Sequence, residues 1–201
     1  FDLLGFAGTS RLINATWFGA GLPYLHGVVA HAKPRQPQLQ IDIFGVDDWP
    51  VISNIKAVDG LCFIATRALA EAVRFDAERL DGFHLYDIDF SFSAHLAGYH
   101  LGVCCDIPII HESAGQFDQK HSRYAEIFFD KYVSRLDSPD GRPRPSSPIW
   151  RGALFKDTTA LMRAWQPDIL QRSTLAAWRG AGVESSRVVL DLPLEYGIEA
   201  T

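Results

Sequence analysis

The chain has 201 residues, and its 19 lysines and arginines against 24 aspartates and glutamates give a formal net charge of −5. Hydrophobic residues make up 47% and charged residues 21%, which argues against a disordered or fibrous chain. No apolar run approaches the roughly 20 residues that span a bilayer. The acidic balance, without a cluster of lysines and arginines, argues against a partner with a phosphate backbone, so we expect no nucleic acid.

The length suits one domain, or one domain with a small appendage. Three cysteines, of which Cys104 and Cys105 are adjacent, give neither a disulfide framework nor the spacing of a zinc site. This usage indicates a reducing compartment, and we expect a cytoplasmic protein. The chain begins at Phe1 inside an apolar run, without methionine or a signal-peptide pattern, so we expect a fragment or a trimmed chain.

The first half of the chain predicts mainly strands. Residues 1–9 are apolar with two glycines, which predicts a buried strand that runs into a loop. Residues 24–31 and 39–46 predict two more strands, separated by a turn-rich segment. A further strand, centred on residues 60–65, is expected within 51–66.

Two helices and a strand are expected next. Thr66 can cap a helix that ends before Phe75. A second helix is predicted to begin near 87–89 and to end at Gly98, a residue type that favours helix termination. The segment 99–110 is then predicted to be a strand.

The last part of the chain changes in composition. Residues 121–136 predict a helix, whereas residues 137–148 contain four prolines and predict a stiff linker. The alternation of strands and helices indicates an α/β fold. We therefore divide the chain into a domain at 1–136, the linker, and a C-terminal extension at 149–201. Within the extension we expect helices at 156–165 and 168–180 and a strand at 187–192.

Two carboxylates stand at the predicted start of the second helix. Asp87 and Asp89 are two positions apart, so their side chains do not share one helical face. Free backbone amides and the helix dipole favour ionised carboxylates there. If Asp89 caps the helix, Asp87 lies in the preceding loop and can point into a cleft as a general base. An N-cap role for Asp89 with no part in chemistry stays open.

A histidine stands at the predicted end of the strand that follows. His111 comes after an apolar run, at a position where loops often hold functional groups. A hydrogen-bonded surface histidine is the structural alternative. The residues alone therefore indicate an α/β domain with a candidate carboxylate and histidine site.

Three segments together resemble a known family. They are residues 2–9, residues 58–67 with the sequence VDGLCFIATR, and residues 83–90 with the sequence FHLYDIDF. In order and spacing, over about residues 2–132, they resemble bacterial family-2-like glycosyltransferases, the nucleotide-diphospho-sugar transferases with a GT-A fold. The last segment resembles the family's acceptor-side acidic motif, usually Glu-Asp-x-Asp-Leu, with Tyr86 in place of the first acid.

The resemblance implies roles for six residues. Asp87 falls on the catalytic base of inverting members, which takes the proton of an acceptor hydroxyl. His111 resembles a histidine that completes a metal shell, so the resemblance implies a divalent cation, Mn²⁺ or Mg²⁺, that stabilises the departing diphosphate. The implied substrate-binding residues are Asp59, Gly60, His84 and Asp89.

The resemblance also implies binding partners and a missing donor-binding half. The partners are a nucleotide-diphospho-sugar donor and a carbohydrate or other hydroxyl acceptor, and a homo-oligomer stays open. Family members place their donor-binding half, with its metal-binding DxD motif, upstream of the segment that begins here, and we expect that half to be absent from this chain. The acidic residues Asp42, Asp47 and Asp48 lie downstream of that position and are not assigned to the donor.

Two other functions stay open. The first is a non-catalytic module of the same ancestry that binds a carbohydrate or a protein. It would use aromatic surfaces, for which the candidates are Trp17, Trp49, Trp150, Trp165 and Trp178. The second is a metal-dependent hydrolase, which ranks last because the chain has no HxH or HExxH spacing.

Overall fold

A computed structural model describes most of the first 139 residues and two short strands beyond them. The described residues are 1–32, 38–45, 50–105, 107, 109–111, 118–139, 150–155 and 198–200. The helices predicted at 156–165 and 168–180 and the strand at 187–192 lie outside the described residues. So does the predicted linker from residue 140 onward.

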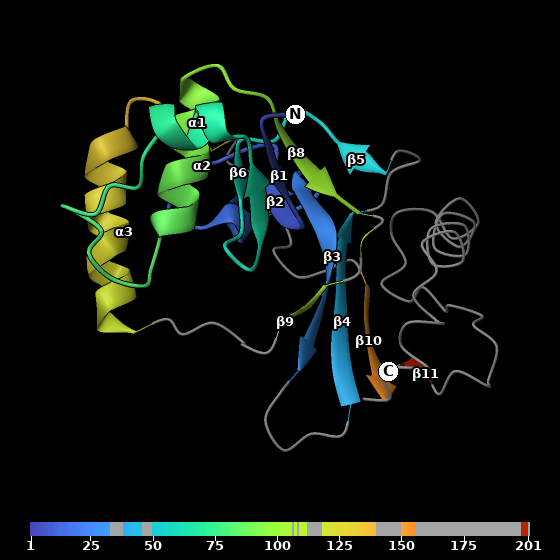
Figure 1. Cartoon of the computed structure of the whole chain (residues 1–201). Helices are drawn as coiled ribbons and strands as arrows, with labels where there is room; N and C mark the ends of the chain where they lie inside the picture. The colour runs from blue at the N-terminus through green and yellow to red at the C-terminus, as the bar shows by residue number, and fades with distance from the viewer. Residues whose placement is uncertain are drawn as a thin grey trace.

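The described residues form a mixed α/β structure with two sheets (Figure 1). The smaller sheet has the order β5-β8-β1-β7, with bounds Val51–Ile52, Leu101–Cys104, Leu3–Gly5 and Phe63–Ala65. Strands β1 and β8 are parallel, while β7 and β5 run antiparallel to their neighbours. This mixed pairing confirms the α/β class.

The larger sheet contains β11, β10, β4, β3, β2 and β6 in that order, and β9 pairs with β3. Their bounds are Ile198–Ala200, Trp150–Phe155, Gln38–Gly45, Leu25–Ala32, Ala7–Thr9, Ala57–Val58 and, for β9, Ile110–His111. Strand β9 is parallel to β3, and the other pairs are antiparallel.

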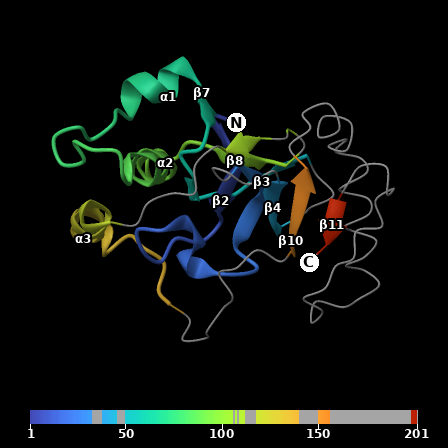
Figure 2. The same ribbon diagram turned by 90° about the horizontal axis from the view of Figure 1, so that it is seen from below.

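In the described part of the chain, three α-helices and one 3₁₀ helix accompany the sheets. They are η1 (Trp17–Ala20), α1 (Arg67–Ala72), α2 (Tyr86–Leu96) and α3 (Gln119–Tyr132). The α-helices lie together on one side of the strands, and α2 and α3 begin at the same end of the molecule (Figures 1 and 2). None of the helices in the described part of the chain is long and apolar enough to cross a membrane.

Several predicted elements are confirmed and others are divided. Strands β3 and β4 match the predictions for 24–31 and 39–46 within a residue or two. The strand predicted within 51–66, centred on residues 60–65, corresponds to β7. Two further short strands, β5 and β6, precede it, because Asn54 takes a positive φ of 59° and the chain turns again after Asp59. Residues 1–9 likewise supply two strands to different sheets, and 99–110 contains β8 and the first residue of β9.

The ends of the first two α-helices follow the sequence signals. The Thr66 side chain accepts a hydrogen bond from the backbone N–H of Leu69, as an N-cap does. At the end of α2, Gly98 has a φ of 87°, the left-handed conformation that glycine adopts without strain. The N–H of Tyr99 then reaches the carbonyl of Ala94, which completes a Schellman motif.

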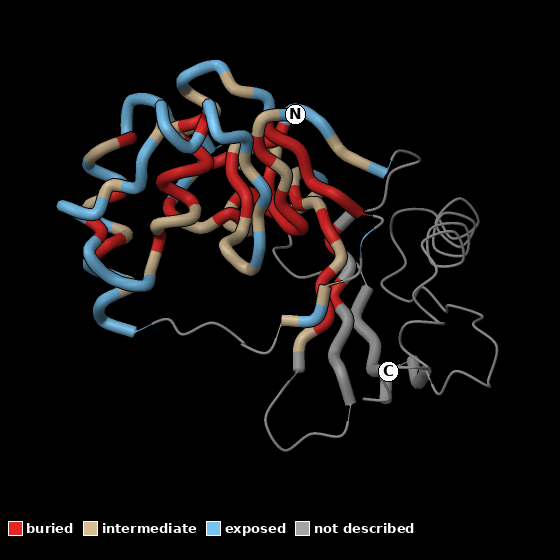
Figure 3. The backbone as a smooth tube through the Cα atoms, viewed as in Figure 1, coloured by how far each residue is buried: buried red, intermediate tan, exposed pale blue. Residues whose placement is uncertain are grey.

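Buried residues occur along most of helix α2 (Figure 3), and they pack on two sides of it. Ile88 and Phe92 pack into the hydrophobic core shared with α3 and the larger sheet. Phe90 and Ala94 pack into a second core with α1 and the smaller sheet. A helix with apolar residues on all sides is stable only inside the protein, so both sheets fix the position of α2. The Ser91 hydroxyl also accepts the N–H of Val58, which ties the helix to β6.

Asp89 lies in a buried ionic network, and the N-cap role that the sequence left open for it does not hold. Leu85 occupies the N-cap position, and Asp89 stands one turn later with only 2% of its surface exposed. Lys131 Nζ donates to Asp89 Oδ1 at 2.8 Å and to Asp76 Oδ2 at 2.7 Å. The Tyr132 hydroxyl donates to the same Asp89 oxygen at 2.9 Å. The network joins α2, α3 and the loop before α2.

We expect Lys131→Met to lower the free energy of unfolding by about 3 kcal/mol, because it leaves the Asp89 carboxylate buried without its cation. Urea denaturation followed by circular dichroism measures the change. Lys120→Met is the matched control, since Lys120 is exposed on the same helix, and a change within about 0.5 kcal/mol is expected. Equal losses in the two variants would show that the network does not stabilise the fold.

Candidate functional site

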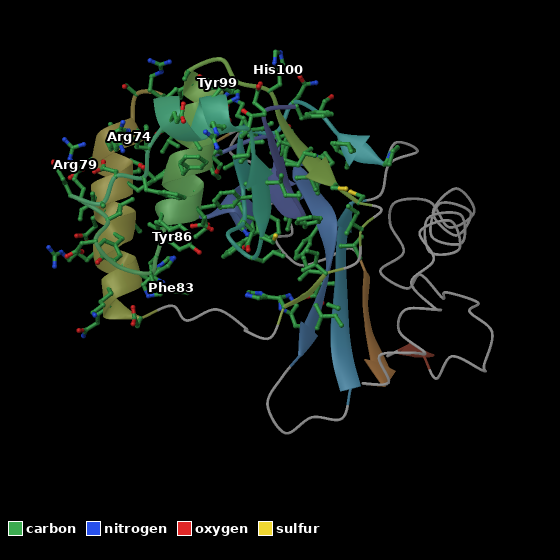
Figure 4. All side chains as sticks on the ribbon, viewed as in Figure 1. Arg74, Arg79, Phe83, Tyr86, Tyr99 and His100 are labelled. Atoms are coloured by element: carbon green, nitrogen blue, oxygen red, sulfur yellow. The ribbon has the colours of Figure 1, made fainter. Side chains whose placement is uncertain are left out.

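A cavity of about 520 Å³ opens where α2 and α3 begin. Its walls come from η1, the turn between β6 and β7, the loop before α2, the first residues of α2 and α3, and β9. Figure 4 labels Phe83 and Tyr86, which lie at this end of α2. The volume is within the range of small-molecule sites.

The structure brings five of the six sequence-predicted site residues to this cavity. The lining contains Asp59, Gly60, His84, Asp87 and His111. Asp89 is not in the lining, because its carboxylate points into the network with Lys131 and Tyr132. Asp89 therefore links α2 to α3 through these bonds and is absent from the cavity lining.

Asp87 stands in the first turn of α2, two residues after a strained residue. Leu85 has a left-handed φ of 62°, a conformation that costs a non-glycine residue about 1 kcal/mol or more. Burial of the Leu85 side chain helps to hold this turn in place. Asp87 Oδ2 accepts a hydrogen bond of 2.6 Å from the backbone N–H of Gly60. The strained entry therefore sets the Asp87 carboxylate against the turn between β6 and β7.

Gly60 is required by this close approach. A Cβ at position 60 would lie 2.8 Å from both Cβ and Oδ2 of Asp87, which is shorter than real Cβ contacts. Any side chain there would push the carboxylate away from the Gly60 N–H. The Asp-Gly pair that the sequence singled out is thus explained by backbone contact with Asp87.

Asp59 is held by three hydrogen bonds, two to its side chain and one from its backbone. The indole Nε1–H of Trp17 donates to Asp59 Oδ2 at 2.6 Å, and the N–H of Leu61 donates to Oδ1 at 2.9 Å. The Asp59 backbone N–H donates to the carbonyl of Ala7 at 2.9 Å. The side chain and backbone of Asp59 are therefore fixed before any ligand binds.

The environment of Asp87 changes its acidity. Burial, and after it the negative charge of Asp59, raise the pKa of Asp87 from 3.8 to about 6. Backbone N–H groups of Ile88 and Gly60 oppose this shift because they stabilise the ionised form. Burial and the charges of both aspartates also raise the pKa of Tyr86. A carboxylate with a pKa near 6 is ionised at neutral pH and is a stronger base than an ordinary aspartate.

The start of α3 adds residues that the sequence did not single out. Asp118 caps α3 by accepting the N–H of His121 at 2.9 Å, and its Oδ1 lies 3.3 Å from His84 Nε2. The rings of His84 and His121 are 5.6 Å apart. Burial, and after it the charge of His84, lower the pKa of His121. Asp118, Lys120 and His121 reach the cavity only because α3 packs beside α2, and no motif links them to Asp87.

Four aromatic side chains complete the lining. They are Trp17, Phe18, Phe83 and Tyr86. Phe83 is 80% exposed, while Trp17 is buried and 7% exposed. Aromatic faces combined with a few hydrogen-bonding groups are typical of sites that bind small organic molecules.

His111, the residue predicted as a metal ligand, lines the cavity. His111 lies on β9 beside His31 of β3, with ring centroids 5.8 Å apart. Within the described residues, no group of three or more histidine, cysteine, aspartate or glutamate side chains is arranged to hold a metal ion. The described donor set therefore does not fit a metal shell, and we derive no step through a cation.

The comparisons with protein-family models, curated proteins and solved structures found no match for this chain. The mixed α/β class consequently rests on the sheets and helices of the chain itself. The function has to be inferred from the cavity and its residues.

We expect Gly60→Ala to displace the Asp87 carboxylate and to destabilise the fold by about 1–3 kcal/mol through overpacking. Carbon-13 NMR of the aspartate carboxyl groups should show a changed titration midpoint for Asp87. Gly98→Ala is the control, because its Cβ would meet nothing within 4 Å although its backbone would be strained. An Asp87 titration that is unchanged in Gly60→Ala would refute the close approach.

Asp87→Asn should raise the free energy of unfolding at pH 7.5 by about 1–3 kcal/mol. The raised pKa means that the folded state binds the Asp87 proton more tightly than the unfolded state. The stabilising contribution of the protonated group is complete below pH 3.8 and is lost as the pH rises through about 6. The advantage of asparagine should therefore vanish toward pH 4, which denaturation at several pH values would reveal. A stability gain of Asp87→Asn that is equal at all pH values would contradict the raised pKa of Asp87.

Proposed function

We propose that this protein is an inverting glycosyltransferase of the GT-A type that uses Asp87 as its general base. The observation that carries the proposal is a partly buried carboxylate with a pKa of about 6 at the wall of an aromatic-lined cavity. The proposed substrates are a nucleotide-diphospho-sugar and a carbohydrate or other acceptor with a free hydroxyl.

The proposed reaction needs one proton transfer to the protein. Ionised Asp87 takes the proton from the acceptor hydroxyl while that oxygen forms a bond to the anomeric carbon of the donor sugar. The bond from the anomeric carbon to the diphosphate breaks, and the nucleoside diphosphate leaves with the electron pair. The Gly60 N–H holds Asp87 in place during this step, since it already donates to Oδ2.

The arrangement of the resembling segments supports the proposal. Residues 58–67 and 83–90 are separated in the sequence but meet at the cavity, where Gly60 donates to Asp87 and Asp59 lines the same wall. His84 and His111 reach the same cavity. Segments that jointly resemble an acceptor site would be expected to share one site. The donor-binding half and the divalent cation remain predictions.

A carbohydrate-binding module without catalysis is the second candidate. The observation that favours it is the set of aromatic rings in the lining, especially the exposed ring of Phe83 beside Tyr86, with centroids 5.9 Å apart. Such rings can stack against the apolar face of a sugar. This module would bind sugars as well after Asp87→Asn as before, whereas the enzyme would lose turnover.

The test is sugar transfer by the protein expressed from its complete reading frame. Release of nucleoside diphosphate is measured with a panel of nucleotide-diphospho-sugars and hydroxyl acceptors, with and without Mn²⁺. Asp87→Asn should lower turnover at least about 100-fold, as loss of a general base does, and sugar binding should persist.

Asp130→Asn is the matched control, because Asp130 is exposed on α3 and absent from the cavity lining. It should keep full activity. Turnover that survives Asp87→Asn would remove the base assignment. Sugar binding without any turnover in the unchanged protein would favour the module.

A further inference from the structure

An aromatic row extends from the cavity onto the surface. Phe83 lines the cavity and is 80% exposed. Its ring centroid lies 5.9 Å from that of Tyr86, which also lines the cavity (Figure 4), and the Tyr86 ring lies 6.1 Å from that of Phe75. Phe75 is 50% exposed and absent from the cavity lining. We call these three side chains the aromatic row, which leads from the cavity of Asp87 to a ring outside it.

The outer end of the aromatic row is held by the core and by α3. The ring of Phe75 stacks on the buried ring of Phe90, with centroids 4.6 Å apart and planes inclined by 24°. The next residue, Asp76, accepts a hydrogen bond of 2.7 Å from Lys131 of α3. The position of Phe75 is therefore set by tertiary contacts, although half of its surface is exposed.

The inner end of the aromatic row is also held by α3. The Tyr124 hydroxyl donates to Asp81 Oδ1 at 2.6 Å, two residues before Phe83. Between them, a Cβ at Gly82 would lie 2.5 Å from the Tyr124 hydroxyl oxygen, which is shorter than real Cβ contacts. Phe83 thus projects into solvent from a backbone that packing and a hydrogen bond hold in place.

A fixed and exposed phenylalanine indicates a binding surface. Exposed apolar patches that are rimmed by polar residues mark interaction sites. A surface that is ordered before binding also loses less conformational entropy when a ligand binds. Both properties hold for the aromatic row, which therefore fits a ligand that continues outward from the cavity.

The charges and ring angles of this surface favour a saccharide. Residues 74–82 carry two arginines and three acidic residues, whereas an anionic membrane surface attracts clusters of lysine and arginine. Side chains of both signs offer donors and acceptors to hydroxyl groups. Successive rings of the aromatic row are inclined by 57° and 61°, so they form no slot with parallel walls for a flat nucleobase. Their spacing is comparable with the length of one pyranose unit.

We propose that the aromatic row binds the second and third units of an oligosaccharide whose terminal unit enters the cavity. Phe83 and Tyr86 stack against the apolar face of the second unit, and Phe75 stacks against the third. The inference rests on the proposed function in one respect, that this oligosaccharide is the acceptor. The acceptor class is then an oligosaccharide, since a single sugar would leave the aromatic row uncovered.

The test measures how affinity depends on the length of the saccharide. The probes are mono-, di-, tri- and tetrasaccharides of glucose, galactose, mannose and N-acetylglucosamine, titrated into the full chain without nucleotide and followed by NMR. In the series that binds, the trisaccharide should bind at least about tenfold more tightly than the monosaccharide, and a fourth unit should add little.

Two variants separate the second unit from the third. Phe83→Ala should remove most of the affinity gained from the second unit, whereas Phe75→Leu should remove only the gain from the third. Phe129→Ala is the matched control, because Phe129 is 46% exposed on α3 and absent from the cavity lining, and its affinities should be unchanged. Urea denaturation checks that each variant folds. If Phe75→Leu does not fold, Phe83→Ala carries the test alone, since the Phe83 ring is 80% exposed.

Three results would overturn the proposal. The first is equal affinity for all lengths, or no binding in any of the four series. The second is a loss of trisaccharide affinity in Phe83→Ala that is no larger than the loss in Phe129→Ala. The third is another occupant that Phe83→Ala releases: vesicles of phosphatidylcholine and phosphatidylglycerol, a second copy of the chain in analytical ultracentrifugation, or uridine diphosphate.

These results are independent of turnover. Length-dependent binding that needs Phe83 would support the saccharide surface even if no sugar transfer were found, and the proposed function would then fail alone. Conversely, sugar transfer that needs Asp87 but is equally efficient with mono- and trisaccharide acceptors would support the proposed function and overturn the inference.

Discussion

The burial of α2 on two sides is the constraint on which the rest of the described structure depends. Ile88 and Phe92 belong to one core, and Phe90 and Ala94 belong to the other. Because neither sheet can move relative to the helix without exposing apolar surface, the first turn of α2 has a fixed position. Asp87 lies in that turn, so the cores decide where the candidate base stands.

Two opposing forces then act on Asp87. The Gly60 N–H stabilises its charge at 2.6 Å, whereas burial and the nearby Asp59 disfavour it. The second effect is larger, and the pKa settles at about 6. A group in this state destabilises the fold slightly at neutral pH, which is a common property of functional sites. Asp89, two residues away, shows the contrast: its charge is balanced by Lys131 and serves stability.

Local signals predicted much of the fold. Thr66 and Gly98 mark helix ends because capping depends on a few neighbouring backbone groups. Strand boundaries were predicted less well, since residues 51–66 form three short strands in two sheets. Apolar runs do not show where a strand leaves one sheet for another, because that depends on partners distant in sequence. The N-cap role left open for Asp89 could not be decided locally either, because Leu85 takes that position and Asp89 is paired with Lys131 of a distant helix.

The sequence by itself determined the α/β class and the residue types at five positions of the cavity, from Asp59 to His111. It also determined the glycine at position 60, whose reason appears only when Asp87 is seen against it. Only the tertiary structure decided that Asp87 faces the cavity while Asp89 is buried. It alone brought Trp17 and the start of α3 to the same place. The physical reason is that hydrogen bonds and desolvation act over a few ångströms, between residues that packing brings together from 27 to 42 positions apart, as for Gly60 with Asp87 and Trp17 with Asp59.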